Sequence, residues 1–129
     1  MQSAIRSTEN AKLAAPFDIG IAFQLGLLYY QNNNLNQAQA EFERALYLNP
    51  SYSNARYFLG LVYDRKGNTK GAVEQFQQVL ALNPDNQEIK NILAKYKDSI
   101  LGLEVIFKPV WTRYFPDNVK KIRLIEKIS

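Results

Sequence analysis

Residues 17–50 read FDIGIAFQLGLLYYQNNNLNQAQAEFERALYLNP, and residues 51–84 read SYSNARYFLGLVYDRKGNTKGAVEQFQQVLALNP. The two stretches are in register, because Pro16, Pro50 and Pro84 recur at intervals of 34 residues. A fixed interval of this length is typical of chains that are built from repeated structural units. The sequence therefore predicts two copies of one unit, at residues 17–50 and 51–84.

Each unit carries two stripes of apolar side chains at helical spacing. Leu25 and Tyr29 lie four residues apart, as do Leu59 and Tyr63, so each pair shares one face of a helix. A second stripe follows in each unit: Ala38, Phe42 and Ala45, then Ala72, Phe76 and Val79. Residues 32–34 and 66–68 hold Asn and Gly, which tolerate the left-handed backbone between two helices. We expect helices near residues 18–32, 35–48, 52–66, 69–82 and 86–101.

The spaced residues resemble the signature of the tetratricopeptide repeat (TPR) family. The residues that carry the resemblance are Leu25, Gly26, Tyr29, Ala38, Phe42, Ala45 and Pro50, then Leu59, Gly60, Tyr63, Ala72, Phe76 and Pro84. Ala22 and Arg56 stand where the family often has tryptophan, and Val79 stands where it often has alanine. The resemblance implies an all-α fold of antiparallel helical hairpins, stacked into a right-handed solenoid.

The two ends of the array depart from the full repeat. Ala4 and Ala11 correspond to Ala38 and Ala45, so residues 2–16 resemble a half repeat that contributes only its second helix. This pattern favours a fragment of a larger TPR protein, and a helix that merely caps the array is the alternative. Residues 85–102 read as a capping helix with one polar side. Residues 103–129 form an apolar and basic tail, which folds back, pairs with another chain or is non-native sequence.

The composition argues against catalysis. The chain has no cysteine and no histidine, which excludes disulfides, thiolate or imidazole metal sites and most catalytic triads. Residues 67–71 lack the spacing of a phosphate-binding loop. Glu41 and Glu43, two apart on a helix, point to different faces. We therefore expect no enzyme activity, no cofactor and no metal site.

The TPR resemblance implies a concave groove lined by the first helix of each repeat, where a partner peptide or helix binds. The predicted partner-binding residues are Phe23, Gln24, Leu27, Tyr30, Tyr57, Leu61, Asp64 and Arg65. Phe58 also falls on the groove side, but a role in packing is favoured for it. Chaperone-binding members hold a terminal carboxylate with Lys and Asn, and Phe23 and Leu27 replace these here. The expected ligand is therefore a protein or peptide with apolar anchors.

The net charge of +4 comes entirely from residues 105–129. Lys120, Lys121 and Arg123 lie near Trp111 and Tyr114 in this segment, so binding of RNA or a membrane surface through the tail is the alternative function. Nucleic-acid binding is nevertheless disfavoured, because charges spread this widely are usually solvated. Self-association or domain swapping through the half repeat or the tail is a further expectation. No transmembrane segment is predicted, and the compartment is left open between the cytoplasm and membrane association through a parent protein.

Overall fold

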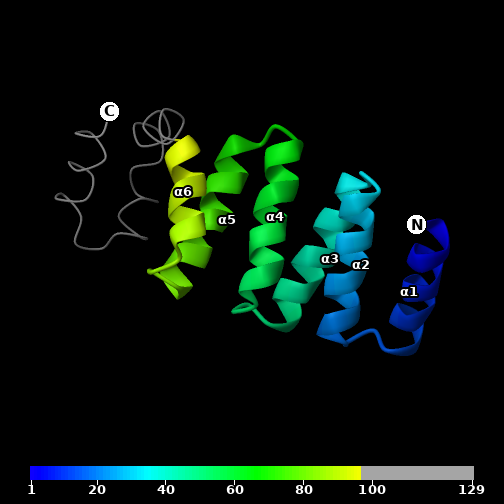
Figure 1. Cartoon of the computed structure of the whole chain (residues 1–129). Helices are drawn as coiled ribbons and strands as arrows, with labels where there is room; N and C mark the ends of the chain where they lie inside the picture. Colours follow the sequence, from blue (N-terminus) through cyan, green and yellow to red (C-terminus); the bar gives the residue numbers. More distant parts are fainter. Residues whose placement is uncertain (97–129) are drawn as a thin grey trace, which may run out of the picture. The chain divides into compact units, whose positions relative to one another are not determined.

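The computed structural model describes residues 1–96, which form six α-helices (Figure 1). The helices are α1 (Gln2–Ala14), α2 (Ile19–Gln31), α3 (Leu35–Leu48), α4 (Ser53–Arg65), α5 (Thr69–Leu82) and α6 (Gln87–Lys95). No strand occurs among these described residues. The predicted all-α fold of helical hairpins is confirmed, and α2 to α5 begin and end within one residue of the predicted positions. Residues 97–101 of the predicted last helix and the tail at 103–129 lie outside the described residues.

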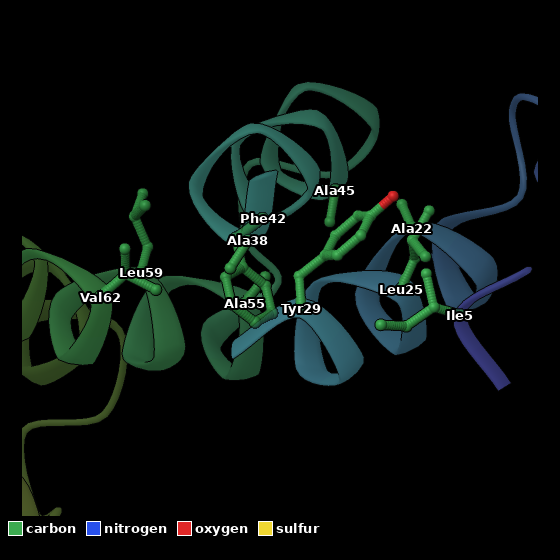
Figure 2. Close-up of a cluster of buried hydrophobic side chains, with 10 residues drawn as sticks. All are labelled: Ile5, Ala22, Leu25, Tyr29, Ala38, Phe42, Ala45, Ala55, Leu59 and Val62. Atoms are coloured by element: carbon green, nitrogen blue, oxygen red, sulfur yellow. The ribbon is translucent and has the colours of Figure 1, made fainter. Parts of the chain in front are cut away.

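The chain divides into two compact units, residues 1–75 and residues 76–129, with the boundary inside α5. The core of the first unit is a cluster of buried side chains from four helices, shown in Figure 2. The cluster comprises Ile5 from α1, Ala22, Leu25 and Tyr29 from α2, Ala38, Phe42 and Ala45 from α3, and Ala55, Leu59 and Val62 from α4. Both stripes predicted for residues 17–50 therefore face this core.

The same turn closes both hairpins. Asn33 has φ 60° and Gly67 has φ 78°, which places both in the left-handed region at the end of α2 and of α4. The amide of Asn34 donates to the carbonyl of Tyr29 at 2.8 Å, and the amide of Asn68 donates to the carbonyl of Tyr63 at the same distance. These bonds satisfy carbonyls that the helix ends leave open. The left-handed turns expected at residues 32–34 and 66–68 are therefore present.

Gly26 lets α2 and α3 approach closely. A Cβ atom at this position would lie 2.6 Å from Cε1 of Phe42, a distance that van der Waals repulsion does not allow. The Phe42 ring is fully buried and fills the space above the glycine backbone. The small residue on one helix and the large ring on the next are therefore one packing feature.

A hydrogen bond between a tyrosine and a glutamate joins α1 to α2, and an equivalent one joins α3 to α4. The Tyr29 hydroxyl donates to Glu9 Oε2 at 2.9 Å, and the Tyr63 hydroxyl donates to Glu43 Oε1 at 3.4 Å. Each residue of the second pair stands 34 positions after its counterpart in the first. This correspondence agrees with reading residues 2–16 as a second helix, although the division of the chain into half repeat, repeats and cap stays a prediction.

In the second unit, the structure describes residues 76–96. Ile89 is buried, and Ile92 and Leu93 are half-buried. The rings of Phe76 and Tyr96 stack with their centroids 6.2 Å apart. Asn86 caps α6, because its side chain accepts a hydrogen bond from the Ile89 amide at 3.1 Å. The predicted apolar stripe of this helix is thus turned inward within the unit.

Candidate functional site

The eight predicted partner-binding residues all lie on α2 and α4, within the first unit. We call these residues the α2–α4 surface; they are Phe23, Gln24, Leu27 and Tyr30 on α2, and Tyr57, Leu61, Asp64 and Arg65 on α4. The five apolar and aromatic members are half-buried, and the three polar members are exposed. None of the eight is sealed in the core, so the surface is open to solvent on one side.

Three aromatic members of the surface are held around one ring, that of Phe58. The ring centroid of Phe58 lies 5.8 Å from that of Phe23, 6.0 Å from that of Tyr30 and 5.3 Å from that of Tyr57. All three contacts are edge-to-face, the arrangement that aromatic quadrupoles favour. Phe58 also stacks on the buried Phe42 at 5.8 Å. Phe58 therefore connects the surface to the core, which agrees with the packing role favoured for it.

One member of this aromatic cluster was missed in the sequence. The Tyr52 ring contacts that of Phe23 edge-to-face at 5.2 Å, and Tyr52 is half-buried at the N-terminal end of α4. The signal that could have found it is its place directly before α4, where a residue lies beside the first turn of the helix. Tyr52 therefore limits the ways in which the Phe23 ring can rotate.

Arg65 joins the end of α4 to α2. Its guanidinium carbon lies 4.0 Å from the ring centroid of Tyr30, within the range of a cation–π interaction. Its Nη1 also donates to the backbone carbonyl of Tyr30 at 3.3 Å. Next to it, Lys66 Nζ donates to Asn36 Oδ1 at 2.7 Å and to Gln39 Oε1 at 2.8 Å. The end of α4 and the residue that follows it therefore contact both α2 and α3.

The structure does not draw all eight residues into one cluster. Leu27 packs against the buried core cluster, as do Phe23 and Tyr30. Leu61 is half-buried on α4, while Gln24 on α2 and Asp64 on α4 are exposed. The three rings and Arg65 thus form a connected set. Whether these residues bind a partner stays a prediction.

Residues 1–96 contain neither an acidic cluster of metal-binding size nor a membrane-spanning helix. Across residues 1–96, no three acidic side chains come together in a group that could hold a metal ion. None of α1 to α6 has the length and apolar character needed to cross a bilayer. The basic aromatic tail, on which RNA or membrane-surface binding would depend, lies outside the described residues.

Comparison with known proteins addresses the family and the fold. A family model described as tetratricopeptide repeat matches residues 23–95, more than half of the chain. No curated protein matches the chain significantly in sequence.

Several solved structures share the fold. The chain superposes on MamA with a TM-score of 0.71 and 25% identity, covering 98% of this chain and 64% of MamA. It superposes on YrrB, described as a TPR protein with an unusual peptide-binding site, with a TM-score of 0.68 and 22% identity, covering 72% of this chain and 48% of YrrB. For the first TPR of Spaghetti (RPAP3), bound to the HSP90 peptide SRMEEVD, the TM-score is 0.69 and the identity 23%, with coverage of 74% and 76%. The chain thus spans about half the length of YrrB.

Proposed function

Because this chain belongs to the tetratricopeptide repeat family, we propose that it is a protein-interaction scaffold that binds a partner peptide or helix on the α2–α4 surface. YrrB is described as having a peptide-binding site, and the RPAP3 domain was solved with a bound peptide. Peptide binding is thus described for YrrB and for the RPAP3 domain. For this chain these descriptions support the class of function, binding of a polypeptide and not catalysis.

The observation that carries the proposal is the aromatic cluster around Phe58. Phe23, Tyr30 and Tyr57 each keep part of their ring exposed while Phe58 fixes their orientation. A ring that is already fixed loses little rotamer freedom when a ligand covers it. Aromatic side chains also give large contact areas and are enriched among the residues that dominate binding energies. The surface therefore suits an apolar side chain of a partner.

The binding proposal can be tested by selecting peptides from a displayed library on the immobilised full chain. Tyr57→Ala and Leu61→Ala are expected to weaken a selected peptide by about 1 to 2 kcal/mol, because each removes contact area from the surface. The matched controls are Tyr47→Ala and Leu13→Ala, since Tyr47 is 85% exposed on α3 and Leu13 is 81% exposed on α1. Titration calorimetry measures the affinities, and circular dichroism checks the helix content.

Two results would contradict the proposal. One is an equal loss of affinity in the matched controls, which would place the binding site elsewhere. The other is unfolding of both surface variants, which would show that Tyr57 and Leu61 belong to the core. Deletion of residues 105–129 separates the alternative function, because binding of RNA or anionic vesicles through the tail would disappear with that segment while peptide binding would persist.

We also propose that the chain self-associates through α1. Ala4 on α1 is exposed, whereas Ala38, which stands 34 residues later on α3, is fully buried. The position that is covered on α3 is therefore open on α1, and a second copy of the chain is proposed to cover it. Light scattering over a range of concentrations tests this point, and a strict monomer at the highest concentration would contradict it.

A further inference from the structure

We infer that Arg65 binds a side-chain carboxylate of the partner, so that the ligand of the α2–α4 surface is a peptide segment with one acidic residue beside its apolar anchors. The inference depends on the proposed function, because it assigns the chemistry of the ligand at the same surface. It follows from the geometry of the last turn of α4.

Arg65 is held in place before any ligand arrives. The Tyr30 ring lies under its guanidinium at 4.0 Å, and the Tyr30 carbonyl accepts one hydrogen bond from Nη1 at 3.3 Å. An arginine on the surface normally loses side-chain entropy when it binds. Here the stacking and the hydrogen bond have already restricted the side chain. The entropy lost on binding a further group is therefore reduced.

Most of the donors of Arg65 are still available for a ligand. A guanidinium carries five N–H donors, and the contact with Tyr30 occupies one of them. Among residues 1–96, no carboxylate lies within ion-pair distance of Arg65. The planar fork of the guanidinium matches the two oxygens of a carboxylate. The exposed side chain thus offers a paired donor edge next to the aromatic cluster.

Among the charged residues at the end of α4, Arg65 is the one proposed to bind the carboxylate. Lys66 directs its ammonium to the amide oxygens of Asn36 and Gln39 at 2.7 and 2.8 Å, so it already has partners on α3. Asp64 is the other charged member of the α2–α4 surface and has interactions of its own. Because its negative charge disfavours a strongly acidic ligand, the expected partner carries one carboxylate and is otherwise apolar.

A side-chain carboxylate is favoured over a chain terminus. Capture of a terminal carboxylate usually takes several converging donors, such as a nest of backbone amides. The α2–α4 surface supplies one guanidinium, which suits a single aspartate or glutamate within a longer segment. Peptides with blocked ends separate the two sources of carboxylate.

The test uses the full chain and a library of decapeptides that are acetylated at the N-terminus and amidated at the C-terminus. Selected peptides are synthesised in pairs that differ only in glutamate or glutamine at the enriched acidic position. Fluorescence anisotropy then gives the ratio of the two affinities for each protein variant. The variants are Arg65→Gln, Arg65→Lys and the matched control Lys66→Gln, which removes the neighbouring cation.

For the wild-type chain we expect the glutamate peptide to bind about tenfold more tightly than its glutamine partner, as for a charge-assisted paired hydrogen bond. The ratio is expected to fall below about twofold in Arg65→Gln and to keep most of its value in Lys66→Gln. In Arg65→Lys it should be intermediate, because an ammonium keeps the charge and loses the planar fork. Raising the salt concentration should lower the wild-type ratio.

The outcomes separate this inference from the proposed function. Selection of apolar peptides with no acidic preference would overturn the inference and leave the binding function standing. Failure of the wild-type chain to select any apolar peptide would overturn the proposed function itself. An acidic preference that persists in Arg65→Gln, or that appears only with a free C-terminus, would also overturn the inference. If Arg65→Gln fails to fold, the ratios in Arg65→Lys and Lys66→Gln decide the matter, since only Arg65→Lys should lower the glutamate preference.

Discussion

Two contacts of the first unit, the junction of α1 with α2 and the junction of α3 with α4, share one kind of hydrogen bond but differ in its length and burial. In both, a tyrosine hydroxyl of the later helix donates to a glutamate of the earlier one, at 2.9 Å for Tyr29 with Glu9 and at 3.4 Å for Tyr63 with Glu43. Tyr29 is buried, with 6% of its surface exposed, whereas Tyr63 is half-buried. The shared spacing sets where the helices lie, and the local residues set how strongly they are joined.

A further difference lies in the contact of α1 with α3, which includes an ion pair. Glu41 of α3 has a side chain that is only 7% exposed, and it lies between Lys12 of α1 at 2.9 Å and Arg44 of α3 at 3.3 Å. Leu46 and Gln75 stand 34 residues after Lys12 and Glu41, so this ion pair has no charged counterpart there. The contact of α1 with α3 is therefore partly ionic, whereas the equivalent positions on α3 and α5 hold an apolar and an amide side chain.

The largest expected effect compares two residues at equivalent positions, Phe42 on α3 and Thr8 on α1. Phe42→Ala should lower the free energy of unfolding by about 3 to 5 kcal/mol, because it leaves a cavity at a fully buried position. Thr8→Ala should cost about 1 kcal/mol or less, since the lost methyl and hydroxyl are small. Urea titration measures both. Equal costs would show that the two positions contribute equally to the core.

The next effect concerns the ion pair between α1 and α3. Glu41→Gln should cost about 1 to 2 kcal/mol, because Lys12 and Arg44 then lose the carboxylate between them. The double variant Lys12→Leu with Glu41→Gln copies Leu46 and Gln75, which stand at the equivalent positions on α3 and α5. We expect it to lie within about 1 kcal/mol of the wild type. Thermal unfolding of the four combinations completes the cycle. A double variant as unstable as the sum of both single variants would refute the equivalence of these two pairs of positions.

A smaller effect is expected from removing the tyrosine hydroxyls. Tyr29→Phe should cost about 1 kcal/mol, because it leaves Glu9 without its 2.9 Å donor. Tyr63→Phe should cost about 0.5 kcal/mol or less, because its hydrogen bond is longer and more exposed. Urea midpoints at neutral pH compare the two. A larger loss for Tyr63→Phe would reverse the ranking of the junctions.

The smallest effect is a dependence of stability on alkaline pH. Burial, then the hydrogen bond and charge of Glu9, raise the pKa of Tyr29 from 10.0 to about 12. Burial and Glu43 also raise the pKa of Tyr63. A raised pKa means that the folded chain holds the proton more tightly, so the stabilisation is complete below pH 10 and is lost as the pH rises towards 12.

The pH effect is isolated by comparing variants, since lysines titrate in the same range. The difference in stability between the wild type and Tyr29→Phe should shrink by up to about 1 kcal/mol between pH 10 and pH 12. The same comparison for Tyr63→Phe should give a smaller change. Urea titrations at each pH supply the values, and a difference that stays constant over this window would rule out titration of Tyr29 as the cause.

The sequence predicted most of the fold for a physical reason. Helix positions depend on local spacing, on Pro50 and Pro84, and on residues such as Gly67 that tolerate a left-handed turn, and all of these can be read along the chain. Contacts between helices depend on the three-dimensional packing of long side chains. The stacking of Arg65 on Tyr30, across 35 positions, was therefore not foreseen. The eight candidate residues were placed on α2 and α4 correctly, and their part in binding awaits experiment.

The close approach of the Phe42 ring to Gly26 also limits which residues can occupy these two positions. Because a Cβ atom there would meet the Phe42 ring at 2.6 Å, a larger residue at position 26 fits only if the residue at position 42 becomes smaller. The two positions should consequently covary as a compensating pair in natural sequences. A designer who extends the array with consensus units would have to change both together.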